Sequence, residues 1–203
     1  MTNPNYTHLT LVVDRSGSMS SMREDANGGI AELLREQFAE DGKLTVTLVD
    51  FDEYFTDVAR MATEPFTYDL HPRGATALLD AVGREVTRTG DDLAALPEDE
   101  RPGRVLFVVV TDGDENHSTE FTLETVRATI NRQRISFGWD FQFIGAGEAA
   151  WQGSELHMSV SSFGADGKGQ RGVYKSMNES MKRFRKGEDH MFTMPDIIPD
   201  DED

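Results

Sequence analysis

The chain has 203 residues, 37% of them hydrophobic, which is enough for one domain with a substantial core. It has 37 acidic and 20 basic residues and a formal net charge of −17. Such an acidic surface repels phosphate backbones, so direct nucleic-acid binding is not expected. The chain has no cysteine, which excludes disulfides, thiolate zinc sites and cysteine nucleophiles.

The amino-terminal segment MTNPNYTHLTLVVDRS has no basic region, and its apolar run LTLVV is too short for a signal sequence or a membrane span. Because the chain also has no cysteine, we expect a cytoplasmic location and no membrane span.

Apolar runs predict four β-strands, at residues 9–13, 44–51, 105–110 and 139–144. Continuous runs of Val, Leu and Phe are typical of strands that are covered on both faces. The segment EYFTDV at residues 53–58 is interpreted as a short antiparallel partner at the edge of the sheet.

Helical periodicity separates these strands. The apolar residues that share a helical face are Ile30, Leu33, Leu34 and Phe38 in the first helix, Leu78, Val82 and Val86 in the second, and Leu123, Val126 and Ile130 in the third. The alternation of strands and helices predicts an α/β fold, with a doubly wound, mainly parallel sheet flanked by helices and right-handed crossovers.

The carboxyl-terminal third of the chain is predicted to form a helix at about residues 148–157, an extended piece at 159–163, a flexible stretch at 164–172 and a final helix. The final helix has four apolar residues at helical spacing, which are Val173, Met177, Met181 and Phe184. The basic run KRFRK before Gly187 is interpreted as the last turn of this helix. Residues 188–203 hold seven acidic and no basic residues, so we expect a domain at 1–187 and a flexible acidic tail at 188–203.

Short side chains that carry oxygen follow the predicted strands. Asp14, Ser16 and Ser18 follow the first strand, Thr76 precedes the second helix, and Asp112 follows the strand at 105–110. Ligands of open α/β sheets bind beyond the carboxyl ends of the strands, where these residues are expected to meet. Each loop also has an ordinary explanation, because Ser and Thr commonly cap helices and Asp-Gly commonly forms a turn.

In this order within a βα alternation, the motifs DxSxS, Gly-x-Thr before a helix and Thr-Asp-Gly after a strand resemble the metal-ion-dependent adhesion site of von Willebrand factor type A domains. The resemblance extends over residues 6–187, and the brevity of the chain is similar to that of small intracellular bacterial or phage-like members. It implies a mainly parallel sheet with a divalent cation at its carboxyl end. The ligands that it implies are Asp14, Ser16, Ser18, Thr76 and Asp112.

This set of ligands would leave the ion electrophilic, because three hydroxyls are neutral and only Asp14 and Asp112 carry charge. The resemblance therefore implies a protein-binding module within a larger complex, in which Mg²⁺ captures a carboxylate of a partner protein. Mn²⁺ suits the same oxygens, and Ca²⁺ is a further candidate. The residues predicted to form the rim around this site are Met19, Met22, Asp114 and Glu115.

Two other classes of function are open to this sequence. A structural or assembly protein would bind through surfaces that need no metal, such as Trp151 or the acidic tail, and the tail is itself a candidate ligand for the metal site. A haloacid-dehalogenase-type enzyme needs a second acid at the position of Ser16, and a serine hydrolase needs glycine at the position of Asp14. The five histidines show no metal-ligand spacing. Because these enzyme patterns are all incomplete, we do not expect an enzyme.

Overall fold

The computed structural model describes residues 1–163 and 170–194. Six strands form one sheet in the order β3-β2-β1-β4-β5-β6. The strands are β1 (Asn3–Asp14), β2 (Lys43–Phe51), β3 (Phe55–Ala62), β4 (Pro102–Thr111), β5 (Asp140–Ala146) and β6 (Ser159–Phe163). Neighbouring strands are parallel except β2 and β3, which are antiparallel, so the predicted doubly wound, mainly parallel α/β sheet is confirmed.

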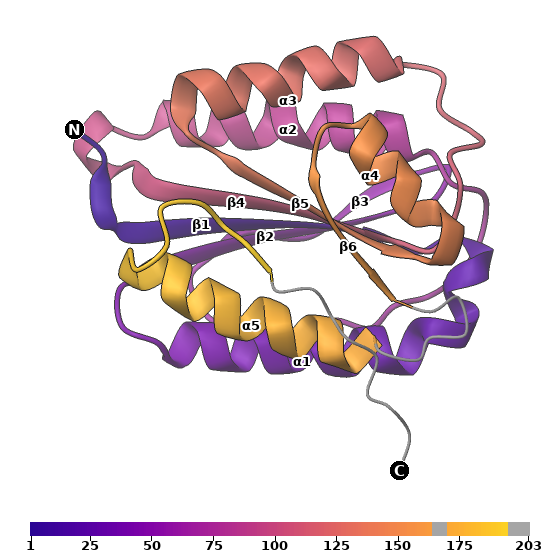
Figure 1. The fold of residues 1–203 in the computed structure, drawn as a ribbon, viewed down its shortest axis with the longest axis horizontal. Coiled ribbons are helices and arrows are strands. Elements are labelled where there is room, and N and C mark those ends of the chain that lie inside the picture. Colours follow the sequence, from indigo (N-terminus) through magenta and orange to yellow (C-terminus); the bar gives the residue numbers. More distant parts are fainter. Residues whose placement is uncertain (164–169, 195–203) are drawn as a thin grey trace.

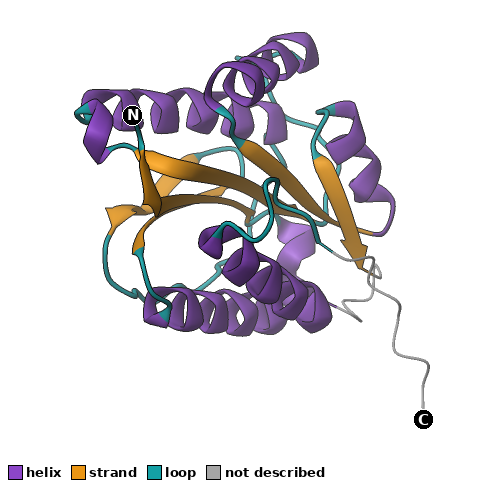
Figure 2. Cartoon of the chain, turned by 60° about the vertical axis from the view of Figure 1, so that its left-hand side comes forward, coloured by secondary structure: helices purple, strands orange, loops and turns teal. Residues whose placement is uncertain are grey.

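Helices cover both faces of this sheet. The helices are α1 (Arg23–Ala39), α2 (Leu78–Ala95), α3 (Leu123–Phe137), α4 (Trp151–Glu155) and α5 (Gln170–Lys186), with short 3₁₀ helices at Gly17–Met22, Glu98–Glu100 and Gly147–Ala150. Helices α1 and α5 lie on one face, and α2 and α3 lie on the other (Figure 1). Figure 2 shows the strands between these two helical layers. No helix of the described ranges is long and apolar enough to cross a membrane.

Strand β1 begins at Asn3, six residues before the apolar run that predicted it. The apolar pattern does not show this extension because Thr7 and His8 are polar. In the structure both residues are buried. The Thr45 hydroxyl hydrogen-bonds the Tyr6 hydroxyl at 2.7 Å and the His8 ring at 2.8 Å. These bonds satisfy polar groups that would otherwise be costly to bury.

The sheet changes winding direction between β1 and β4. The chain passes from β1 to β2 on one side, and β4, β5 and β6 follow on the other side. Beyond the carboxyl ends of β1 and β4, the loops that follow these two strands therefore lie next to each other. This is the position at which open α/β sheets bind their ligands.

The carboxyl-terminal part of the chain differs from the prediction in two respects. The predicted helix at 148–157 consists of a 3₁₀ turn followed by the five-residue α4. The segment after α5 is also not a free tail up to residue 194, because Phe192 is 3% exposed and its ring packs at right angles on Phe184. The domain thus extends past 187, while residues 195–203 of the predicted tail and 164–169 of the predicted flexible stretch lie outside the described residues.

Helix α5 ends as its sequence predicts. Gly187 has φ of +72°, and the backbone N–H of Glu188 donates to the carbonyl of Arg183 at 3.1 Å. This is the left-handed cap for which glycine is favoured. Arg185 does more than end the helix, because its buried guanidinium donates to the Asp41 and Gly42 carbonyls beyond the end of α1.

Candidate functional site

Asp14 is the last residue of β1, and its carboxylate is buried beneath the first loop. One carboxylate oxygen accepts a hydrogen bond from the Ser16 backbone N–H at 2.6 Å. The other accepts one from the Thr111 hydroxyl, at the end of β4, at 2.5 Å. Asp14 therefore joins the first loop to the strand that carries the third loop.

The two serines of the first loop face the site and do not cap a helix. Ser16 precedes the 3₁₀ helix, and no capping bond from its side chain to that helix is present. Its hydroxyl instead lies 3.0 Å from the Ser18 hydroxyl, which donates to an Asp112 carboxylate oxygen at 2.7 Å. A chain of polar contacts thus connects the first loop to the third.

Thr76 is buried and does not cap the helix that follows it, because the N-cap position of α2 is Ala77. The first turn of α2 is capped from another loop, since Leu79 N–H donates to Glu115 and Asp80 N–H donates to the Ser118 hydroxyl. The explanation of Thr76 as a helix cap is therefore wrong, and its hydroxyl is left to the site.

Gly113 marks the point where side chains from the three loops converge. A Cβ atom added at Gly113 would lie 2.9 Å from Thr76 Oγ1, 3.4 Å from Ser18 Oγ and 3.5 Å from Asp14 Oδ2. Only a residue without a side chain leaves this space to the oxygens. Hydroxyl and carboxylate oxygens around a small space suit a hard divalent cation, so the residues present fit the ion that the sequence motifs imply.

Burial makes negative charge unfavourable at this site. It raises the pKa of Asp14 to about 6, against the hydrogen bonds from Thr111 and Ser16, and it also raises the pKa of Asp112. A cation bound between the two carboxylates would favour their ionised forms. Over the described ranges 1–163 and 170–194, no group of three or more His, Cys, Asp or Glu side chains could hold a metal.

The predicted rim needs correction. Met19 and Met22 are buried and belong to the core cluster on the α1 and α5 face, so they are not available to a partner. The Glu115 carboxylate accepts hydrogen bonds from the Leu79 N–H at 2.9 Å and the Ser118 N–H at 2.7 Å, which assigns it to capping α2. Of the four predicted rim residues, Asp114 is exposed.

Gln152 on α4 holds the third loop in place, a role that sequence reasoning missed. Its side chain is buried, donates to the Gly113 carbonyl at 2.9 Å and accepts from the Glu115 N–H at 2.8 Å. The neighbouring Trp151 is 56% exposed. No pattern in the sequence distinguishes this glutamine from one on a helix surface.

The sequence analysis also did not predict a buried ion cluster under the first loop. Arg15 donates to Asp50 at 2.8 Å and to Asp52 at 3.1 Å, and Arg73 donates to the same Asp52 oxygen at 2.7 Å. Burial opposes ionisation of Asp52, but the hydrogen bonds from Arg15, Tyr54 and Arg73 hold its pKa below the ordinary value. The available signal was Asp50 within the apolar run LTVTLVDF.

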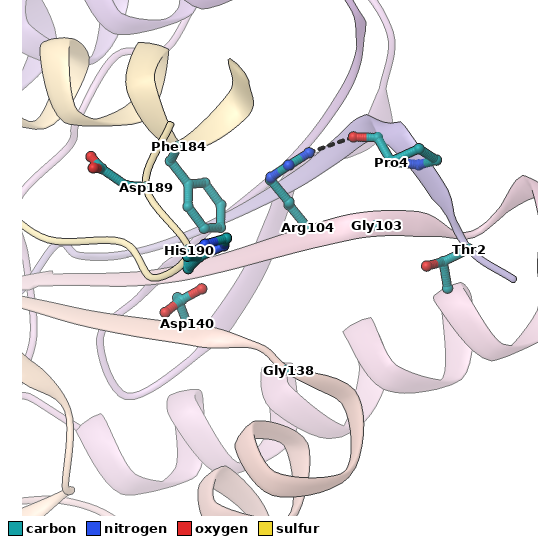
Figure 3. Close-up of a pocket in the computed structure, with 9 residues that line it drawn as sticks. All are labelled: Thr2, Pro4, Gly103, Arg104, Gly138, Asp140, Phe184, Asp189 and His190. Atoms are coloured by element: carbon teal, nitrogen blue, oxygen red, sulfur yellow. Dashed lines mark hydrogen bonds between the residues drawn. The ribbon is translucent and has the colours of Figure 1, made fainter. Parts of the chain in front are cut away.

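A separate pocket of about 230 Å³ lies at the amino ends of β4 and β5, and its lining includes Arg104, Asp140 and His190. Figure 3 shows Asp140 and His190 next to each other beneath Phe184. Burial raises the pKa of Asp140 to about 6, against a hydrogen bond from the Phe192 backbone. Because this pocket lies at the amino ends of the strands, it is not part of the candidate site.

No protein-family model matches the sequence, and no curated protein matches it. Solved structures do match. One is a von Willebrand factor type A protein from Catenulispora acidiphila, with 17% identity and a TM-score of 0.59 over 87% of this chain and 42% of that one. This chain thus spans less than half of that protein.

Two further matches are pilus proteins. The vWF domain of the type V pili tip protein Mfa5 from Porphyromonas gingivalis is 10% identical, with a TM-score of 0.61 over 95% of this chain and 98% of that one. The pilus adhesin SpaC from Lactobacillus rhamnosus GG is 11% identical, with a TM-score of 0.63 over 88% of this chain and 30% of that one. Together with the six-stranded sheet and its one antiparallel edge strand, these likenesses show that the chain has the von Willebrand factor A fold.

Proposed function

We propose that the chain is a divalent-cation-dependent protein-binding module. The observation that carries the proposal is the convergence of Thr76, Ser18 and Asp14 oxygens on the space above Gly113. These oxygens come from loops that are far apart in the sequence. Neither helix capping nor the packing of the core requires them to meet there.

In this proposal Asp14, Ser16, Ser18, Thr76 and Asp112 hold the ion. A bound Mg²⁺ supplies positive charge and a coordination position that a carboxylate of the partner protein can take. Five residues are proposed as ligands and Mg²⁺ takes six oxygens, so one coordination position is left for a carboxylate of the partner. Mn²⁺ is expected to substitute because it prefers the same oxygens, and Ca²⁺ is a further candidate.

The matched structures support an interaction role. Two of them are described as a pilus tip protein and a pilus adhesin. For this chain, the binding of a partner's carboxylate within a larger complex is a proposal. A cytoplasmic location is also a proposal, and cell fractionation tests it. No catalytic step is part of the proposed function.

A second candidate is assembly through a surface that needs no metal. The observation in its favour is Trp151, which is 56% exposed on α4 beside the third loop. In that case a partner would remain bound after the metal is removed by EDTA.

The first test is metal binding by the purified chain, measured by isothermal titration calorimetry with Mg²⁺ and Mn²⁺. We expect Thr76→Ala and Asp112→Ala each to weaken binding at least about tenfold while circular dichroism stays unchanged, because both residues lie in loops. Asp114→Ala is the matched control, since Asp114 is an exposed acid in the same loop as Asp112. Equal affinity of all three variants and the unaltered chain would contradict the assignment of the site.

The second test is partner capture with the same proteins. The unaltered chain is expected to retain a partner in Mg²⁺ and to release it in EDTA, and Asp112→Ala is expected to retain none. A partner retained equally in EDTA would favour the Trp151 surface over the metal site.

A further inference from the structure

Arg15 belongs to the first loop of the candidate site, but its side chain bonds carboxylates outside the proposed set of ligands. It lies between Asp14 and Ser16 in the sequence and is only 7% exposed. Its guanidinium bonds Asp50 Oδ1 at 2.8 Å, Asp52 Oδ2 at 3.1 Å and Asp52 Oδ1 at 3.3 Å. The positive charge is therefore committed to two buried carboxylates and does not reach a partner.

Asp52 joins the first loop to the loop that carries Thr76. Its carboxylate accepts from Arg15 and, at 2.7 Å, from Arg73. The backbone carbonyl of Asp52 accepts from the Ala77 N–H at 3.2 Å, directly after Thr76. Both site loops are thus fixed to the end of β2.

Backbone hydrogen bonds join the same two loops directly. The Arg73 N–H donates to the Arg15 carbonyl at 2.7 Å, and the Gly17 N–H donates to the Gly74 carbonyl at 3.2 Å. Gly74 has φ of +72°, and a Cβ there would lie 3.2 Å from the Cβ of Asp52. The loops therefore approach each other closely around the ion cluster.

We propose that Arg15 is a positioning residue for the metal site. Through Asp50 and Asp52, its guanidinium holds the first loop and the loop that carries Thr76 at a fixed separation. This inference rests on the proposed function. Mg²⁺ and Mn²⁺ require oxygens at fixed distances, about 2.0–2.1 Å for Mg²⁺, so a small change in loop separation lowers affinity. Residues that orient metal ligands typically contribute about 10- to 100-fold in metal affinity.

The experiment compares Arg15→Met with Arg185→Met in the full chain. Arg185 is 8% exposed and is bonded to the Asp41 and Gly42 carbonyls before β2, at the end of the sheet opposite the site. Both substitutions remove a buried guanidinium, so both are expected to lower the urea midpoint of unfolding. Only Arg15→Met is expected to weaken Mn²⁺ binding, by about 10- to 100-fold, in titrations followed by the free-ion electron paramagnetic resonance signal.

A second pair of variants covers the case in which Arg15→Met does not fold. The Arg73 side chain is 61% exposed, so Arg73→Met leaves the core intact and removes one of the two guanidinium groups that contact Asp52. We expect about three- to tenfold weaker Mn²⁺ binding. Arg84→Met is its matched control, because Arg84 is a partly exposed arginine on α2 that pairs with Glu120.

The outcomes separate the inference from the proposed function. If the unaltered chain binds Mn²⁺ and neither Arg73→Met nor a folded Arg15→Met binds it more weakly, the inference is overturned and the metal site stands. The same holds if Arg185→Met weakens binding as much as Arg15→Met, because the effect then reports stability alone. If the unaltered chain does not bind Mn²⁺, both are overturned.

Discussion

At the scale of single residues, Gly113 leaves room for the candidate site because it has no side chain. It leaves the space around which oxygens of Thr76, Ser18 and Asp14 converge. The requirement comes from contacts with other loops and not from the backbone of Gly113, which is absent from the residues with positive φ.

Gly113→Ala is therefore expected to weaken Mn²⁺ binding at least about tenfold, because the added methyl group lies within 2.9 Å of Thr76 Oγ1. Calorimetric titration measures the effect. Gly28→Ala is the control, since Gly28 lies on α1 with no atom within 4 Å of an added Cβ. It is expected to leave metal binding unchanged and to stabilise the fold by roughly 0.5–1 kcal/mol. If Gly113→Ala bound Mn²⁺ with unchanged affinity, the oxygens that converge at Gly113 would not form the metal site.

The five predicted ligand residues were accessible to sequence reasoning because they follow strand ends in a recognisable order. Their supports were not. Arg15 and Gln152 act through side-chain bonds to Asp52 and to Gly113, and these partners are distant in the sequence. The sequence alone does not distinguish a buried arginine next to an expected ligand from an exposed one.

At the scale of elements, the segment that follows α5 completes the core. Helices α1 and α5 share their face of the sheet with residues of β5, among them Ile144 and Ala146. Phe192 belongs to the same cluster, and Met194 packs against it. The acidic composition of 188–203 predicted a tail. Composition describes the whole segment, so it does not show that the single ring of Phe192 packs in the core.

Phe192→Ala is expected to destabilise the fold by about 3–5 kcal/mol, the usual cost of removing a buried aromatic ring. Met191→Ala is the neighbouring control, because Met191 is 65% exposed and Phe192 is 3% exposed. Urea unfolding of both variants measures the difference. If the two variants had equal midpoints, the segment would not be part of the core.

The strands and helices themselves were mostly predictable. Apolar runs marked the four central strands, and helical periodicity marked α1, α2, α3 and α5. The errors fall where polarity and burial disagree, as at Thr7 and His8 in β1, or where an element is too short for periodicity, as in α4. In both cases tertiary contacts decide the structure, and local sequence does not contain them.

At the scale of the whole molecule, a chain of buried hydrogen bonds crosses the α2 side of the sheet. The His8 ring bonds Thr10 at 3.1 Å, Thr10 lies 3.3 Å from the Thr89 hydroxyl, and Thr89 donates to Glu85 at 2.9 Å. Burial, together with the nearby Arg60 guanidinium, lowers the pKa of His8 to about 3. His8 is therefore neutral in the folded protein at physiological pH.

This burial makes stability depend on pH. In the unfolded chain His8 has its ordinary pKa of about 6.5, so between pH 6.5 and 3 the unfolded state binds a proton that the folded state does not. The contribution of His8 to stability is present above pH 6.5 and is lost as the pH falls, by ~2 kcal/mol between pH 7.5 and pH 5. His8→Gln is expected to remove this part of the change in urea unfolding. If the variant and the unaltered chain lost equal stability over this range, His8 would not be the cause.

The position of β1 in the sheet also affects how the protein is made. Leu9 of β1 pairs with Val46 of β2 on one side and with Leu106 of β4 on the other. During synthesis the β2 partner leaves the ribosome early, whereas the β4 partner follows about sixty residues later, and Asp112 and Gly113 come with it. A nascent chain that has not reached this point has one unpaired side of β1 exposed and no third loop. Under the proposed function, an ion that needs all three loops would bind only after β4 has inserted, so it would stabilise the completed sheet and none of its precursors.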